Sequence, residues 1–117
     1  MIKEYNCNPE DLIVCICPSI RKCHFKVRTD VKEKCENIFS YTNRLEEIMQ
    51  YIGKDEIGED SWLVDTVLIN KILLIDCGLK EENIIDSGIC SVCNSEIVHS
   101  CRVEGKGYGL SCAIICL

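Results

Sequence analysis

The chain has 117 residues, of which 47% are hydrophobic and 27% are charged, with both signs represented. This length allows one domain that buries about two thirds of its unfolded surface, and the balance of residue types argues against disorder. The formal net charge of −6 argues against nucleic acid and an anionic membrane as partners, because both bind basic surfaces.

The beginning of the sequence carries no targeting signal that we recognise. Met1–Asp11 is polar and acidic, unlike the apolar stretch of a signal peptide. No apolar run approaches the ~20 residues of a membrane span. We therefore expect a cytoplasmic protein.

Eleven cysteines are the least usual feature of the composition. In a secreted chain this density would predict a disulfide framework, but the count is odd and we see no secretion signal. Several cysteines lie in apolar runs, where a thiol serves as a small hydrophobic side chain. We expect reduced, buried thiols at Cys15, Cys17, Cys112 and Cys116.

The first elements in chain order are a strand and two helices. Leu12–Cys17 is a continuous apolar run before Pro18, which predicts a fully buried strand that enters a turn. Asp30 with Glu33 three residues later resembles a helix N-cap. The first helix then carries apolar residues at helical spacing, namely Val31, Cys35, Ile38 and Phe39. The second helix carries Leu45, Ile48, Met49 and Ile52, and it ends at Gly53.

The middle of the chain predicts a loop, a short strand and a third helix. Residues 54–61 are acidic and form the loop, and Trp62–Val64 forms the strand. Asp65 is placed to cap the third helix, and Gly78 to end it as the glycine that follows a helix C-cap. The apolar face of this helix consists of Leu68, Ile72 and Leu73.

The last third of the chain predicts strands. Asn83–Asp86 is a short strand, and the alternation of apolar and polar residues over Ile97–Val103 indicates a half-buried one. Gly105–Gly109 predicts a turn, and Leu110–Leu117 predicts a core strand.

The order of these elements predicts an α+β fold, a mixed sheet with packed helices, in a single domain over residues 1–117. We expect the sheet to contain Leu12–Cys17, Ile97–Val103 and Leu110–Leu117. Strand edges of this kind can pair with another chain.

Cys90 and Cys93 have the spacing of metal ligands. With His99 and Cys101 nearby, they could supply four soft ligands to zinc. The alternative is a set of structural thiols, which we favour because one CxxC without a second pair is a weak signal. His99 and Cys101 would also point away from the loop as members of a strand. A redox role would need a helix to begin at the first cysteine, whereas the following sequence predicts a strand.

Cys23 and His24 have the residue types of a nucleophile and its base. Adjacent side chains of an extended segment point to opposite sides, so we expect no hydrogen bond between them. The chain has two histidines, His24 and His99, which are too few for a histidine-rich catalytic site.

Three blocks of the sequence match motifs of a known family. LIVCICPSIRKCHFKV at residues 12–27 is similar to IGPxIxxCxYEV. Trp62–Leu79 is similar to DLxxxNxxxLxxxGV, and SGICSVC at residues 87–93 and EIVHSCR at residues 96–102 are similar to SGLCTYC and ELFHSYR. These are motifs of the laccase-domain proteins, also called polyphenol oxidases, multicopper oxidoreductases, peptidoglycan editing factors and purine nucleoside phosphorylases. The chain resembles their C-terminal half.

The resemblance implies a zinc-dependent enzyme of purine nucleoside metabolism. Such an enzyme cleaves adenosine, inosine, guanosine and methylthioadenosine with phosphate, and it also deaminates adenosine. The family's metal site consists of two histidines and one cysteine in HG, ADC and HAGWRG motifs of the N-terminal half, and none of these motifs occurs here. The resemblance therefore assigns no catalytic residue, no cofactor and no metal ligand to this chain.

Three positions depart from the family pattern. Cys17 replaces a glycine, Cys101 replaces a tyrosine and Leu110 replaces an arginine. We expect a truncated or separately encoded half of the enzyme, inactive alone, that self-associates or binds an N-terminal-half protein. The alternative is a small thiol- or zinc-binding module built on Cys90 and Cys93, with His99 and Cys101.

Overall fold

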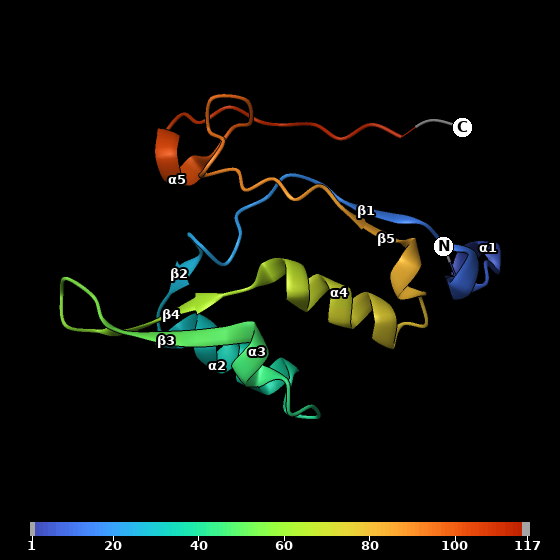
Figure 1. Cartoon of the computed structure of the whole chain (residues 1–117), viewed down its shortest axis with the longest axis horizontal. Coiled ribbons are helices and arrows are strands. Elements are labelled where there is room, and N and C mark those ends of the chain that lie inside the picture. Colours follow the sequence, from blue (N-terminus) through green and yellow to red (C-terminus); the bar gives the residue numbers. More distant parts are fainter. Residues whose placement is uncertain (1, 116–117) are drawn as a thin grey trace. The chain divides into compact units, whose positions relative to one another are not determined.

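The computed structural model describes residues 2–115, which divide into two compact units (Figure 1). Of the described residues, the first unit combines residues 2–20 with residues 70–115, and the second contains residues 21–69. The boundary at residue 70 falls inside helix α4 (Thr66–Asp76). Helices, parallel strands and antiparallel strands all occur, which confirms the predicted α+β class. No helix among the described residues is long and apolar enough to span a membrane.

The second unit is built around a three-stranded antiparallel sheet. Its elements are β2 (Lys26–Val27), α2 (Thr29–Ile38), α3 (Leu45–Ile48), β3 (Met49–Lys54) and β4 (Asp60–Val64). The strand order is β2–β4–β3, and β3 and β4 form a hairpin (Figure 1). Asp55 shapes the hairpin loop, because its Oδ1 accepts hydrogen bonds from the backbone N–H groups of Ile57 and Glu59, at 3.1 and 3.0 Å.

The core of the second unit consists of buried side chains from α3, from β4 and from the residue that follows α2. Phe39, Ile48 and Val64 are each at most 1% exposed. Burying apolar side chains of this size stabilises the fold by about 1.5–3 kcal/mol each. Ser61 is buried as well, and its hydroxyl donates a hydrogen bond of 2.8 Å to the backbone oxygen of Gly53. The one polar side chain in this group is therefore satisfied across the hairpin.

The predicted helix near Asp30 is confirmed, with a shift at its start. Arg28 is the N-cap residue of α2. Asp30 lies in the first turn, where a carboxylate interacts favourably with the helix dipole. Cys35 is the buried residue of this helix, and burial raises the pKa of its thiol.

Helix α4 has both of its predicted end signals. At its start, the Oδ1 atom of Asp65 accepts a hydrogen bond of 2.9 Å from the backbone N–H of Leu68. At its end, Gly78 has a φ of 92°, a conformation that favours glycine. The N–H groups of Gly78 and Leu79 donate to carbonyl oxygens of the last turn at 2.8 and 3.1 Å, which is the Schellman pairing.

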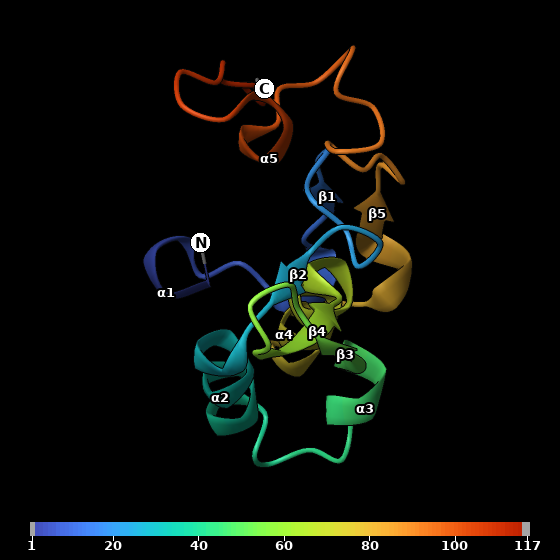
Figure 2. The same ribbon diagram turned by 90° about the vertical axis from the view of Figure 1, so that its left-hand side faces the viewer.

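The first unit contains a parallel pair of short strands. These strands are β1 (Val14–Ile16) and β5 (Ile84–Asp86), which lie side by side in Figure 1 and Figure 2. A β-bridge between Ser19 and Cys90 continues the pairing beyond them. The other elements are α1 (Ile2–Tyr5), the 3₁₀ turns η1 (Pro9–Asp11) and η2 (Glu81–Asn83), and α5 (Cys101–Glu104).

The predicted second helix is wrong beyond its first turn. α3 ends at Ile48, and Met49 and Ile52 belong to strand β3. The apolar spacing is compatible with either structure over so few residues. Pairing with β4, with Tyr51 opposite Trp62, decides in favour of the strand.

The two predicted strands near the C-terminus are also wrong in the described part of the chain. Residues 101–104 form helix α5, and residues 110–115 form no strand. Leu110, Ile114 and Ile115 are between 83% and 94% exposed. The predicted sheet of these runs with Leu12–Cys17 is therefore not formed, because β1 pairs with β5 instead. Cys116 and Leu117 lie outside the described residues.

The predicted burial of the thiols in apolar runs is wrong as well. Cys15, Cys17 and Cys112 are exposed, and of the ten described cysteines Cys35 and Cys90 are buried. The side chains of β1 are exposed or half-buried because the strand belongs to a sheet of two strands, which leaves much of it uncovered.

Candidate metal centre

Cys90 and Cys93 lie on a loop that hydrogen bonds hold in place. The backbone oxygen of Cys90 accepts a bond of 3.0 Å from the N–H of Asn94 and a bond of 2.9 Å from the Asn94 side chain. The backbone of Ser19 donates to Ile89 at 3.3 Å and accepts from Ser91 at 3.1 Å. The Sγ atoms of Cys90 and Cys93 lie within 4.8 Å of one another, with Cys90 buried and Cys93 exposed. The loop therefore presents two sulfurs together.

Cys23 and His24 belong to a turn at the start of the second unit. The N–H groups of His24 and Phe25 both donate to the carbonyl oxygen of Arg21, at 2.9 Å. This turn brings the Sγ atom of Cys23 to 3.2 Å from the Nδ1 atom of His24. The expectation that the two side chains point apart is wrong, because the segment is a turn and not extended.

Two pairs of side chains in the described part of the chain carry soft donor atoms, Cys90 with Cys93 and Cys23 with His24. Cys90 and Cys93 belong to the first unit, and Cys23 and His24 to the second. Thiolates with an imidazole suit Zn²⁺ and other soft cations, whereas Ca²⁺ and Mg²⁺ require oxygen ligands.

Among residues 2–115, the structure does not bring His99 or Cys101 together with Cys90 and Cys93 as candidate metal ligands. The Nδ1 atom of His99 lies 3.1 Å from the carboxylate of Glu104. The N–H groups of Ser100 and Gly109 donate to the same carboxylate at 2.7 and 3.1 Å, and these bonds hold the pKa of Glu104 below its ordinary value. Cys101 is exposed at the start of α5.

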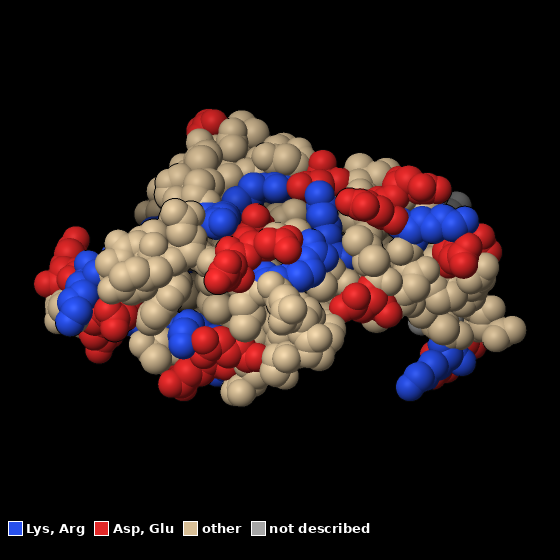
Figure 3. Space-filling view, turned by 60° about the horizontal axis from the view of Figure 1, so that its bottom comes forward, with Lys and Arg blue, Asp and Glu red and all other residues tan. Residues whose placement is uncertain are grey.

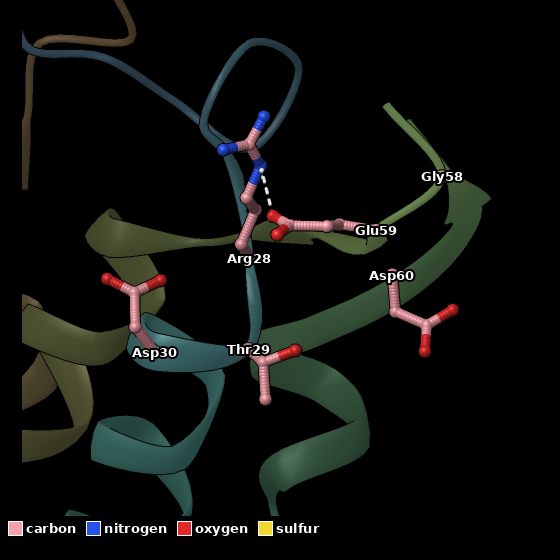
Figure 4. A pocket seen from close by; sticks show the side chains of 6 residues that line it. All are labelled: Arg28, Thr29, Asp30, Gly58, Glu59 and Asp60. Atoms are coloured by element: carbon pink, nitrogen blue, oxygen red, sulfur yellow. Dashed lines mark ion pairs between the residues drawn. The ribbon is translucent and has the colours of Figure 1, made fainter. Parts of the chain in front are cut away.

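A polar depression of about 530 Å³ lies at the hairpin end of the second unit, and Figure 4 shows its lining. Arg28 is one of its lining residues, and its Nε atom lies 2.8 Å from Asp55 and 3.1 Å from Glu59. The hydrogen bond to Asp55 raises the pKa of the Arg28 guanidinium. Because this cation is already paired with two carboxylates, the depression offers little attraction to an anion. Its lining consists of Arg28, Thr29, Asp30, Gly58, Glu59 and Asp60.

On the face in Figure 3, lysine and arginine side chains lie beside aspartate and glutamate side chains. Apolar and uncharged residues cover much of the remainder of this view.

Comparison with known proteins identifies the family. Residues 1–117 match the family described as multi-copper polyphenol oxidoreductase laccase. The chain belongs to this laccase family. Its fold is similar to the crystal structure of the Bacillus licheniformis hypothetical protein YfiH, with a TM-score of 0.66 and 24% sequence identity. A comparison with curated proteins gave no match.

The similarity to YfiH covers 79% of this chain and 32% of the YfiH chain, so the chain spans about a third of the length of that relative. Within this laccase-family chain, the block at residues 87–93 forms the loop that carries Cys90 and Cys93. The block Trp62–Leu79 forms the end of β4 and the whole of α4. Leu110, one of the three departures from the family pattern, is 83% exposed.

Proposed function

We propose that this chain is the C-terminal part of a cytoplasmic, laccase-domain purine nucleoside phosphorylase and has no catalytic activity by itself. The observation that carries this proposal is the match to the family along all 117 residues, in a sequence without the HG, ADC and HAGWRG motifs. A zinc ion that activates a nucleophile needs three protein ligands, and the family takes these from the missing motifs. Catalysis then requires a polypeptide that carries them, whether in the same chain or a separate one.

Exposed apolar side chains support a role within a larger assembly. Leu110, Ile114 and Ile115 are more than 80% exposed and follow one another closely in an extended segment. Soluble proteins rarely leave contiguous apolar surface uncovered. We infer that the polypeptide with the metal motifs covers this segment. Without that polypeptide we expect self-association, which light scattering at micromolar concentration under reducing conditions measures.

An enzyme assay tests the proposal. The protein of residues 1–117 is purified under reducing conditions, supplied with Zn²⁺, and incubated with inosine and phosphate. We expect no release of hypoxanthine from this protein alone. We expect release after co-expression with a laccase-domain polypeptide that carries the three motifs.

The matched control is the same co-expressed pair with the cysteine of the ADC motif replaced by serine, which removes a metal ligand and leaves the assembly in place. Zinc-dependent release of hypoxanthine by residues 1–117 alone would contradict the proposal. Activity of the companion polypeptide that does not change when this chain is added would also contradict it.

A further inference from the structure

We propose that Cys90 and Cys93 form a two-thiolate binding site for a soft metal ion of the Zn²⁺ class. The proposal concerns side chains of the first unit alone and holds whether or not the chain has a companion polypeptide. It also differs from the set expected from the sequence, because His99 and Cys101 are not part of it.

The distance between the sulfurs fits one shared ion. Zn–S bonds of about 2.3 Å at a tetrahedral ion place two sulfurs about 3.8 Å apart. The Sγ atoms of Cys90 and Cys93 lie within 4.8 Å of one another before any ion is present. The two sulfurs therefore need to approach by at most about 1 Å to share one ion.

The loop is held in shape independently of an ion. Cys90, the first cysteine of the loop, lies in the β-bridge to Ser19. The carbonyl oxygen of Cys90 accepts two hydrogen bonds from Asn94. These bonds fix the backbone on both sides of Cys90. Less conformational entropy is then lost on binding than in an unstructured CxxC segment.

The exposure of the two thiols suits both binding and entry of the ion. Cys90 is 5% exposed, so its sulfur lies in a site from which water is largely excluded, where a metal–thiolate bond is strengthened. Cys93 is exposed and gives the ion a path from solvent. Two thiolates leave two positions of a four-coordinate ion for other ligands. Cys23 and His24 of the second unit have soft donor atoms too, so a variant of these two residues tests whether zinc is bound there instead.

The test measures metal bound by the full chain under reducing conditions. Wild-type protein and variants are incubated with Zn²⁺, desalted and analysed for zinc, and Co²⁺ is then substituted to record the thiolate-to-metal charge-transfer absorbance. The variants are Cys90→Ser, Cys93→Ser, a Cys23→Ser/His24→Ala double variant and Cys77→Ser. Cys77 is the matched control, because it is an exposed cysteine of the same unit outside the candidate group.

We expect wild-type protein and the Cys77→Ser variant to retain zinc, and Cys90→Ser and Cys93→Ser each to weaken binding at least tenfold and reduce the charge-transfer band. Serine at the buried position 90 could disturb folding, whereas Cys93 is exposed. The Cys93→Ser variant therefore tests the site independently of folding. Three results would overturn the proposal: no zinc retained by wild-type protein, equal loss in the Cys77→Ser control, or loss in the double variant with full retention in Cys93→Ser.

Discussion

The Nδ1 atom of His24 lies 3.2 Å from the Sγ atom of Cys23, although the two residues are neighbours in the chain. The contact exists because the carbonyl oxygen of Arg21 accepts hydrogen bonds from the two N–H groups that follow Cys23, which folds this segment into a turn. An imidazole at this distance can accept the thiol proton, and the thiolate is the reactive form of cysteine.

We predict that replacing His24 with alanine slows alkylation of Cys23. The variant removes the base that lies next to the thiol, so His24→Ala should lower the initial rate of reaction with iodoacetamide severalfold at neutral pH. Mass spectrometry of the metal-free protein measures the rate at each cysteine, and exposed Cys77 is the internal control. An unchanged rate at Cys23 in the variant would show that the contact does not affect the thiol.

The sequence predicted those elements whose signals are local. The N-cap at Asp65 and the glycine at position 78 identified α4 at both ends, because each acts through hydrogen bonds within one turn of the helix. The strand β5 and the strand part of Leu12–Cys17 were also predicted, although the parallel pairing between them was not.

The errors concern elements that depend on distant partners. Met49 and Ile52 follow helical spacing, yet pairing with β4 makes them part of a strand. The run Ile97–Val103 alternates like a strand, but the carboxylate of Glu104 binds the N–H groups on either side of α5 and curves the segment. The spacing of apolar residues within one segment does not show which residues elsewhere in the chain the segment will contact.

For the candidate site, the sequence predicted one pair of side chains and missed a second pair. The spacing of Cys90 and Cys93 is visible in the sequence and the structure brings their sulfurs together. The pairing of Cys23 with His24 was missed because it depends on a turn, and no glycine or asparagine marks this turn in the sequence. Their adjacency was the one available signal.

We predict that Ile48→Ala strongly destabilises the second unit. Ile48 is 0% exposed, and removing a buried isoleucine side chain to alanine costs about 2–5 kcal/mol in the free energy of unfolding. Chemical denaturation followed by Trp62 fluorescence measures this, because Trp62 lies in β4 of the same unit. The matched control is Ile57→Ala, at a position that is 68% exposed, which should change stability by less than about 0.5 kcal/mol. Equal effects at the two positions would contradict the core assignment.

We predict that acid loosens the segment around α5. Two backbone hydrogen bonds hold the pKa of Glu104 below its ordinary value of 4.5. The larger effect comes from the N–H of Ser100 and the smaller from the N–H of Gly109. The ionised carboxylate therefore stabilises the folded segment. This stabilisation is complete at a pH above the ordinary pKa of the carboxyl group. It is lost as the pH falls through the lowered pKa of the folded state.

Amide hydrogen exchange checks this pH dependence. Protection at Ser100 and Gly109, corrected for intrinsic exchange, should fall as the pH drops below 4.5, the ordinary value for this carboxyl group. Glu104→Gln should show low protection already at neutral pH and little further change with acid. Glu96→Gln, at another exposed glutamate, is the control and should behave like the wild type. Full protection in Glu104→Gln would show that the carboxylate does not hold the segment.

We predict that Gly109→Ala breaks the contact between His99 and Glu104. A Cβ atom at position 109 would overlap the ring of His99, so the ring has to move away from the carboxylate that it contacts at 3.1 Å. The φ of Gly109 is not in the positive range that strains alanine, which leaves the overlap as the main effect. Nuclear Overhauser effects between the His99 ring and the Glu104 side chain should disappear, and protection of the Ser100 amide should fall. A double-mutant cycle separates overlap from other causes: in a His99→Ala background, Gly109→Ala should have little additional effect on that protection. An equally large loss in both backgrounds would mean that the backbone at position 109, and not the ring of His99, requires glycine.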